Sequence, residues 1–170
     1  NVIKIARDFG ISTLTDSSRY GLSLVLGGGE VKLIDIVGAY SVFSQDGVKH
    51  NQKIIIKIEN NQGEIIESST DYAVQVIEPQ YAQMINDVLS DEEARKPLYS
   101  GSFGLTVFQD KQVAMKTGTT DDYRDAWTIG YSPNLAVGVW AGNNRQEPMQ
   151  KNAGSILAAL PIWNAFMKET

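Results

Sequence analysis

The sequence predicts an α+β domain in which helices pack against an antiparallel sheet. Three observations predict it. Apolar residues recur with helical spacing in the first part of the chain, switch to strand-like patterns from Leu105 onward, and return to helical spacing at the end. With 170 residues, of which 42% are hydrophobic, the chain is long enough for one domain with its own core or for part of a larger one.

The first part of the chain is predicted to hold two helices. Residues 2–9 carry apolar side chains at positions i, i+3, i+4 and i+7, and Gly10 is expected to end that helix. The glycines at residues 27–29 predict a turn. A second apolar stripe over residues 33–43 predicts a helix that ends near residues 46–47.

The spacing of apolar residues then changes from helical to strand-like and returns to helical. Alternating isoleucines at residues 54–58 predict a strand, residues 60–63 a turn, and residues 64–66 a return strand. Pro79 suits the first turn of a further helix. The apolar stripe of that helix consists of Tyr81, Met84, Ile85 and Val88.

A short helix is predicted next. Ser90 and Glu93 have the spacing of a capping box, in which each side chain bonds the backbone N–H of the other. Pro97 is expected to close this helix.

The following segments are predicted to be strands. Residues 105–108 and 113–117 predict two strands joined by a short turn. Residues 127–131 alternate Trp, Ile and Tyr with Thr and Gly, which predicts a strand with one solvent-exposed face.

The last segments complete the sheet and add a helix. Residues 132–134 predict a turn, and residues 135–141 are apolar on both faces, which is typical of a central strand covered by helices. Apolar residues spaced over 156–167 predict a C-terminal helix, kinked at Pro161. The whole order predicts a sheet with helices packed across it.

Composition excludes several function classes. The formal charge of −5 comes from 20 Asp plus Glu against 15 Lys plus Arg, and the basic residues do not cluster. We therefore expect no nucleic-acid partner and no anionic membrane surface as partner. No apolar run approaches the ~20 residues of a membrane-spanning helix.

The residue types also argue against a metal or cofactor. The chain has no cysteine, which excludes a disulfide scaffold, a thiolate zinc site and a cysteine nucleophile. The glycines at residues 27–29 lack the spacing of a phosphate-binding loop. His50 is the only histidine, and the adjacent Asp121 and Asp122 are expected to be solvated. We expect no metal site and no cofactor.

The segment that carries chemistry is Lys116, Thr117, Gly118 and Thr119, at the end of a predicted strand. A strand edge can pair with an extended peptide, and Gly118 lets a substrate backbone approach because it has no Cβ. The hydroxyls of Thr117 and Thr119 can donate to a carboxylate, while Lys116 supplies positive charge. Such a triplet also occurs by chance in solvated turns, so its context decides its meaning.

The context resembles a known family. The similar segments are residues 20–31, 39–43, 115–120, 125–133, 137–143 and 161–163. In this order they resemble the transpeptidase domain of class A penicillin-binding proteins, with most similarity to type 1C, and the resemblance covers essentially the whole chain. The implied fold is the β-lactamase-like antiparallel sheet flanked by helices, here incomplete.

The resemblance implies acyl transfer in cell-wall peptidoglycan synthesis. A serine would attack the D-Ala-D-Ala stem peptide, expel its last residue and pass the acyl group to an amine, and β-lactam antibiotics would trap the same serine. Lys116 would be catalytic, holding the substrate carboxylate and passing protons. Thr117, Gly118 and Thr119 would bind substrate, with the Thr119 N–H as half of the oxyanion hole. The parent protein would have a glycosyltransferase domain upstream and would work outside the cytoplasmic membrane, anchored to it.

The chain departs from the family pattern at one point. The family requires Ser-x-x-Lys and Ser-x-Asn besides Lys-Thr-Gly, and no serine of this chain has lysine three positions later. The Ser-x-Asn at residues 132–134 lies in a predicted hairpin turn and is expected to be structural. We therefore expect residues 1–170 to be the C-terminal portion of the domain, inactive without the missing N-terminal half that carries the nucleophile.

Two other interpretations remain open. The chain is alternatively a non-catalytic module that recognises peptide or peptidoglycan ends through the same edge. It is otherwise a purely structural fragment that pairs with the missing half.

Overall fold

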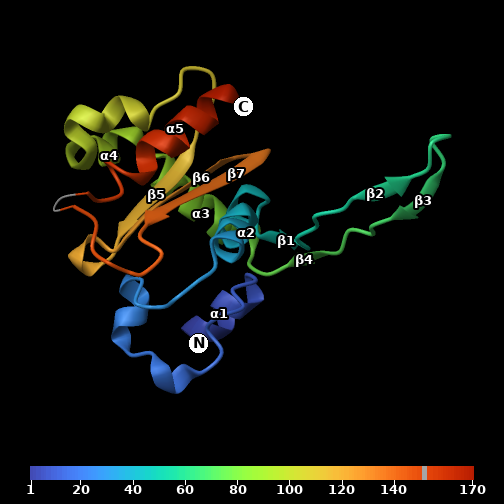
Figure 1. The fold of residues 1–170 in the computed structure, drawn as a ribbon, viewed down its shortest axis with the longest axis horizontal. Helices are drawn as coiled ribbons and strands as arrows, with labels where there is room; N and C mark the ends of the chain where they lie inside the picture. The colour runs from blue at the N-terminus through green and yellow to red at the C-terminus, as the bar shows by residue number, and fades with distance from the viewer. Residues whose placement is uncertain (151–152) are drawn as a thin grey trace.

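The structure, a computed structural model, describes residues 1–150 and 153–170. A three-stranded antiparallel sheet lies at the centre, in the order β5-β6-β7 (Figure 1). Its strands are β5 (Ala114–Thr119), β6 (Asp125–Ser132) and β7 (Leu135–Gly142). Antiparallel strands combined with helices confirm the predicted α+β class.

The strand order corrects one prediction. β7 forms an edge of the sheet, and β6 is the central strand. The apolar pattern of β7 arises because α2 (Leu33–Ser44) and α5 (Ala159–Glu169) pack on its two faces. A strand can therefore be covered on both faces without being flanked on both edges. Pro133 and Asn134 join β6 to β7, which confirms the predicted turn.

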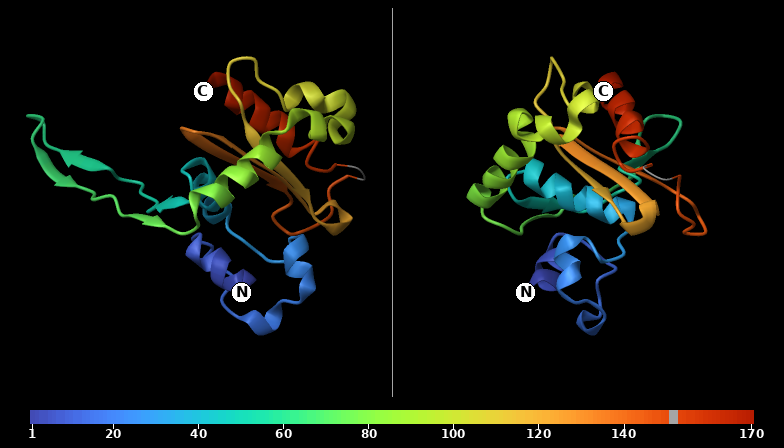
Figure 2. Two further views of the ribbon diagram at one scale, coloured as in Figure 1. Left: turned by 180° about the vertical axis from the view of Figure 1, so that it is seen from behind. Right: turned by 90° about the vertical axis from the view of Figure 1, so that its left-hand side faces the viewer.

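Helices cover both faces of the sheet (Figure 2). α2 and α3 (Pro79–Ser90) lie on one face, and α5 lies on the other. Gly130 in β6 faces Trp163 of α5, whereas Gly138 in β7 faces Val37 of α2. The predicted solvent-exposed face of β6 is therefore wrong: Ala126, Thr128 and Gly130 on that face are buried, and only Ser132 at the end of the strand is partly exposed.

The C-terminal helix packs through one stripe. Leu160, Trp163 and Met167 are fully buried and form a core with residues of β5 and of α4 (Glu92–Tyr99). Pro161 is the third residue of α5. In this first turn its missing N–H has no intrahelical partner to lose, so the proline is accommodated and α5 continues without interruption to Glu169.

The N-terminal region forms a second core. It contains α1 (Val2–Asp8) and short 3₁₀ helices at Ser17–Arg19 and Leu22–Leu26. Gly27 follows in the left-handed region with φ of 95°, which suits a glycine turn. The buried members of this core are Phe9, Ile11, Leu14, Ala39 and Val42, which join the segment after α1 to α2.

A long β-arm extends away from this body (Figure 1). At its base, β1 (Val48–His50) pairs with β4 (Ala73–Gln75). Farther out, β2 (Lys57–Glu59) pairs with β3 (Ile65–Ser68). The predicted turn and return strand are confirmed, but the outgoing strand begins only at Lys57. The pairing of β1 with β4 was not predicted, because segments of three residues carry too little alternation to be recognised.

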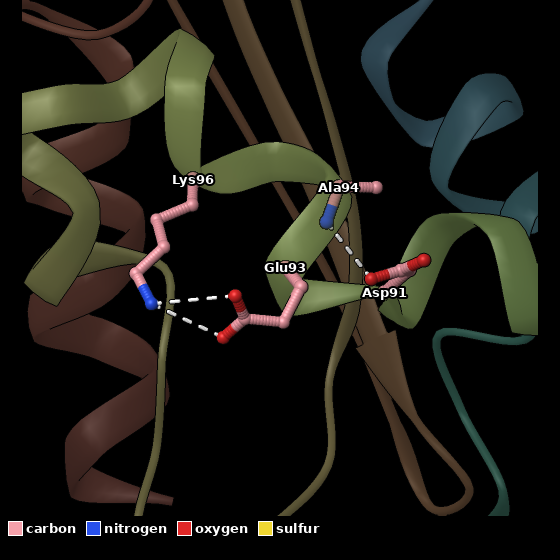
Figure 3. Close-up of polar contacts among 4 residues, drawn as sticks. All are labelled: Asp91, Glu93, Ala94 and Lys96. Atoms are coloured by element: carbon pink, nitrogen blue, oxygen red, sulfur yellow. Dashed lines mark hydrogen bonds and ion pairs between the residues drawn. The ribbon is translucent and has the colours of Figure 1, made fainter.

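The start of α4 corrects the capping prediction (Figure 3). The N-cap is Asp91, whose carboxylate accepts from the Ala94 N–H at 2.9 Å, rather than Ser90. Glu93 instead pairs with Lys96 Nζ at 3.1 Å. Aspartate is a favourable N-cap residue because its carboxylate accepts hydrogen bonds from the free N–H groups and its negative charge interacts favourably with the helix dipole.

The end of α4 also differs from the prediction. Pro97 lies inside the helix, which runs on to Tyr99. A 3₁₀ helix, Ser100–Leu105, follows, and residues 106–108 of the predicted strand over residues 105–108 are neither helix nor strand. Its apolar residues Phe103 and Leu105 pack against the core beneath α5. In so short a segment, the apolar pattern of a strand cannot be distinguished from that of a 3₁₀ helix that packs on a core.

Candidate active site at the β5 edge

Lys116, Thr117, Gly118 and Thr119 lie in sequence along β5, at a free edge of the sheet. Their side chains alternate between the two faces. Lys116 and Gly118 share the face covered by α2 and α3, since Lys116 is opposite Ile129 and Gly118 opposite Trp127. Thr117 and Thr119 point to the face of α4 and α5. The strand thus brings all four predicted residues together but divides them between two faces.

The free edge exposes specific backbone groups. The Thr120 N–H donates to the Asp125 carbonyl at 3.0 Å, which continues the β5–β6 ladder beyond the strand. Because hydrogen bonding alternates along an antiparallel pair, the N–H and C=O of Thr117 and Thr119 point away from β6. Apart from the Thr117 carbonyl, which accepts from Lys116 Nζ, these groups point to the side from which an extended ligand could pair with the edge.

The Lys116 ammonium lies at this edge and is exposed. Its Nζ donates to the Thr117 carbonyl at 2.5 Å. Among the described residues, no carboxylate forms an ion pair with it. The positive charge is therefore not neutralised by a neighbouring acid.

The two threonine hydroxyls have partners within the chain. Thr117 Oγ1 is 2.9 Å from the hydroxyl of Tyr99 in a buried contact. Thr119 Oγ1 accepts from the Ser155 N–H at 3.0 Å and donates to Ser155 Oγ at 3.2 Å. Tyr99 and Ser155 were not predicted as part of this region, and no sequence signal links residues 18 and 36 positions apart.

Gly118 has open space on its side-chain side. A Cβ at this position would meet only Trp127 Cβ, at an ordinary 3.8 Å. The surface beside the backbone is therefore free, as close approach of a substrate backbone requires.

The loop after β5 is held by hydrogen bonds. Asp125 accepts from Thr120 Oγ1 at 3.0 Å and from Trp140 Nε1 at 2.8 Å. This carboxylate joins the ends of β5, β6 and β7. It fixes the position of the strand that carries Lys116.

Other candidate groups lie elsewhere. His50 Nδ1 is 2.6 Å from Asp71 at the base of the arm, and this hydrogen bond lowers the pKa of the Asp71 carboxyl. Across residues 1–150 and 153–170, no three acidic or histidine side chains are grouped so as to hold a metal ion. No helix in the same residues is both long and apolar enough to cross a membrane.

Comparison with known proteins gives a consistent result. The family model "Penicillin binding protein transpeptidase domain" matches residues 12–168. Penicillin-binding protein 1A of Aquifex aeolicus is 32% identical over 98% of this chain, and that of Neisseria flavescens is 30% identical over 86%. These relatives are of type 1A, whereas the motifs suggested type 1C; both are class A.

Solved structures share the fold. PonA1 from Mycobacterium tuberculosis is similar with a TM-score of 0.75 and 26% identity over 95% of this chain, and a second PonA1 structure is a complex with penicillin V. Penicillin-binding protein 1A from Haemophilus influenzae also gives a TM-score of 0.75, at 20% identity over 98% of the chain.

The chain is shorter than each of these proteins. It spans 22% of the Aquifex protein, 18% of the Neisseria protein and 47% of the PonA1 chain. Within that span, the family match extends over both the N-terminal core and the sheet. The chain belongs to the transpeptidase domain family of class A penicillin-binding proteins.

Proposed function

We propose that this chain supplies the Lys-Thr-Gly wall of a peptidoglycan D,D-transpeptidase site, and that the acylated serine comes from a segment outside residues 1–170. The whole protein would cross-link stem peptides ending in D-Ala-D-Ala and would bind β-lactams. It would act on the outer side of the cytoplasmic membrane. The chain would correspond to the C-terminal part of the transpeptidase domain.

The observation that carries this proposal is the edge of β5. The Lys116 ammonium and the outward N–H of Thr119 lie on the same free strand edge, next to the open surface of Gly118. An extended peptide can add to such an edge through backbone hydrogen bonds. Its terminal carboxylate would then be attracted by Lys116.

The chemistry follows from these groups. The serine oxygen would attack the carbonyl of the penultimate D-alanine, form an ester and release the last D-alanine, and an amine would then take the acyl group. The Thr119 N–H would stabilise the negative charge that develops on the carbonyl oxygen. Removing one such donor typically lowers the rate by about 10²–10³.

The proposed division of the site rests on the sequence. No serine of the chain has lysine three positions later, and the second oxyanion donor would be the amide of the absent serine. The chain alone is therefore expected to form no acyl-enzyme.

An exposed helix face is consistent with a further segment of the domain. In α3, the buried residue is Ala82, whereas the predicted apolar stripe is exposed. The exposed side chains are Tyr81, Met84, Ile85 and Val88. An apolar surface of this kind favours a covering partner.

A hybrid protein tests the proposal. Residues 1–170 would replace the matching segment of Aquifex aeolicus penicillin-binding protein 1A, and labelling by a fluorescent penicillin would be measured. We expect labelling, and a loss of at least about tenfold in Lys116→Ala. Lys57→Ala, on the distant β-arm, is the matched control and should label normally.

The chain by itself supplies the complementary test. Incubation with penicillin should leave its intact mass unchanged, and an adduct would contradict the divided site. Saturable binding of a D-Ala-D-Ala peptide, together with a hybrid that is never labelled, would instead identify a non-catalytic binding module.

A further inference from the structure

The outer part of the β-arm is a two-stranded sheet without a covering layer. Among the described residues β2 pairs only with β3, and the left view of Figure 2 shows the arm extending away from the body. Its isoleucine side chains are exposed: Ile54, Ile55, Ile56, Ile58, Ile65 and Ile66. An exposed strand with apolar side chains is a template for pairing with another strand.

The outward backbone groups of β2 follow from the ladder. The Ser69 N–H donates to the Ile56 carbonyl at 2.8 Å, and Lys57 is opposite Ser68. Because bonded and non-bonded pairs alternate, the N–H and C=O of Lys57 point away from β3. The Asn60 N–H donates to the Glu64 carbonyl at 3.0 Å. The N–H and C=O of Glu59, one residue earlier, therefore also point away from β3.

We propose that two copies of this chain associate by antiparallel pairing of β2 with β2, giving a four-stranded sheet across a twofold axis at Ile58. In this register Lys57 exchanges backbone hydrogen bonds with the partner's Glu59, and Glu59 with the partner's Lys57. A twofold interface requires such self-complementarity.

Side-chain charge favours this register. Lys57 Nζ is 2.7 Å from Glu59 Oε1 within one strand, so both head groups lie on the same face. In the pair, each lysine would lie beside its own glutamate and opposite the partner's Glu59. A twofold axis at Lys57 would instead place Lys57 directly opposite the partner's Lys57, which is destabilising.

The other edge of the arm is less suited to pairing. The β2–β3 register shifts between Ile58 and Glu59, so that Ile66 in β3 has no partner residue. Such a bulge bends and twists the strand that carries it and interrupts its ladder. The regular edge of the arm is therefore that of β2.

A cysteine cross-link tests the axis directly, because the natural chain has no cysteine. Directly opposed residues of a non-bonded antiparallel pair have Cα atoms about 4.5 Å apart, within disulfide range. We expect the full 170-residue chain carrying Ile58→Cys to form a disulfide dimer under mild oxidation. Glu67→Cys, opposite Ile58 on β3, is the matched control and should stay mostly uncross-linked.

Charge exchange tests the register. By sedimentation, Lys57→Glu and Glu59→Lys should each weaken dimerisation by about tenfold or more, since each places like charges across the axis. The double variant should recover, and mixing the two single variants should give a heterodimer. A monomeric natural chain, equal cross-linking at both cysteine positions, or self-association indifferent to these charges would overturn the proposal.

Discussion

The hydroxyls of Tyr99 and Thr117 lie 2.9 Å apart in the buried region between α4 and β5. Tyr99 ends α4, and Thr117 is the central residue of the Lys-Thr-Gly triplet. This contact joins the layer of α4 to the strand that carries the proposed site. A substrate carboxylate would have to compete with Tyr99 for the Thr117 hydroxyl.

We therefore expect Tyr99→Phe to affect stability more than acylation. The change leaves the buried Thr117 hydroxyl without its partner, at a cost of about 1–2 kcal/mol in the free energy of unfolding. Urea unfolding of the chain measures this loss. Penicillin labelling of the hybrid protein should be undiminished, and a large drop in labelling would show that Tyr99 acts on the site itself.

Two glycines of the sheet should respond differently to alanine. A Cβ at Gly130 would lie 2.3 Å from the Trp163 ring and 2.9 Å from the Ala114 carbonyl oxygen, so Gly130→Ala should destabilise the chain by about 1–3 kcal/mol. Gly118→Ala meets only ordinary contacts. It should leave the thermal midpoint nearly unchanged while lowering penicillin labelling of the hybrid; equal stability losses at the two positions would contradict this.

The capping residue of α4 can be identified by substitution. Asp91→Ala removes the acceptor of the Ala94 N–H and should cost about 1 kcal/mol. Ser90→Ala should cost less, because among the described residues the Ser90 hydroxyl accepts only from the exposed Gln112 side chain. A larger loss at Ser90, measured by chemical unfolding, would restore the capping box that the sequence predicted.

Asp35 is expected to make stability depend on pH. Burial raises its pKa, but hydrogen bonds from the Ser12 side chain and backbone, at 2.6 and 2.9 Å, and the charge of Lys32 outweigh burial and lower the pKa overall. With a lowered folded-state pKa, the stabilisation is present above the unfolded value of about 3.9. It is lost as pH falls through the folded value.

Ser12→Ala tests this linkage. We expect the variant to unfold more easily at pH 7 by about 1–2 kcal/mol, and the difference from the natural chain to shrink in acid below about pH 3. Asp35→Asn, which cannot ionise, should show a weaker pH dependence between about pH 2 and 5. A constant difference at all pH values would rule out a contribution from Asp35 ionisation.

Local patterns predicted much of the fold. The stripe over residues 33–43 and Pro79 correctly indicated α2 and α3, and residues 132–134 indicated the hairpin between β6 and β7. The strand predicted over residues 113–117, with Lys116 at its end, corresponds to β5, which extends to Thr119 and so includes the whole Lys-Thr-Gly triplet. These features depend on residues within a few positions of one another, so the spacing of apolar residues along the sequence indicates them directly.

Other features could not be read in this way. The stripe of Tyr81, Met84 and Val88 predicted a helix correctly but not that this face would be exposed. The same ambiguity affected β7, whose two apolar faces did not reveal that it is an edge strand. Periodicity shows which side chains are apolar, and it does not show which elements lie against them.

The sequence by itself determined the family, the main helices, the strands of the central sheet, and the presence of Lys116 close to a glycine. Only the tertiary structure decided that Thr117 turns toward Tyr99 and Thr119 toward Ser155, while the Lys116 ammonium remains without an acidic partner among the described residues. The physical reason is that a strand fixes alternation locally, but which face meets α4 and α5, and which edge stays open, depends on contacts between segments far apart in the chain.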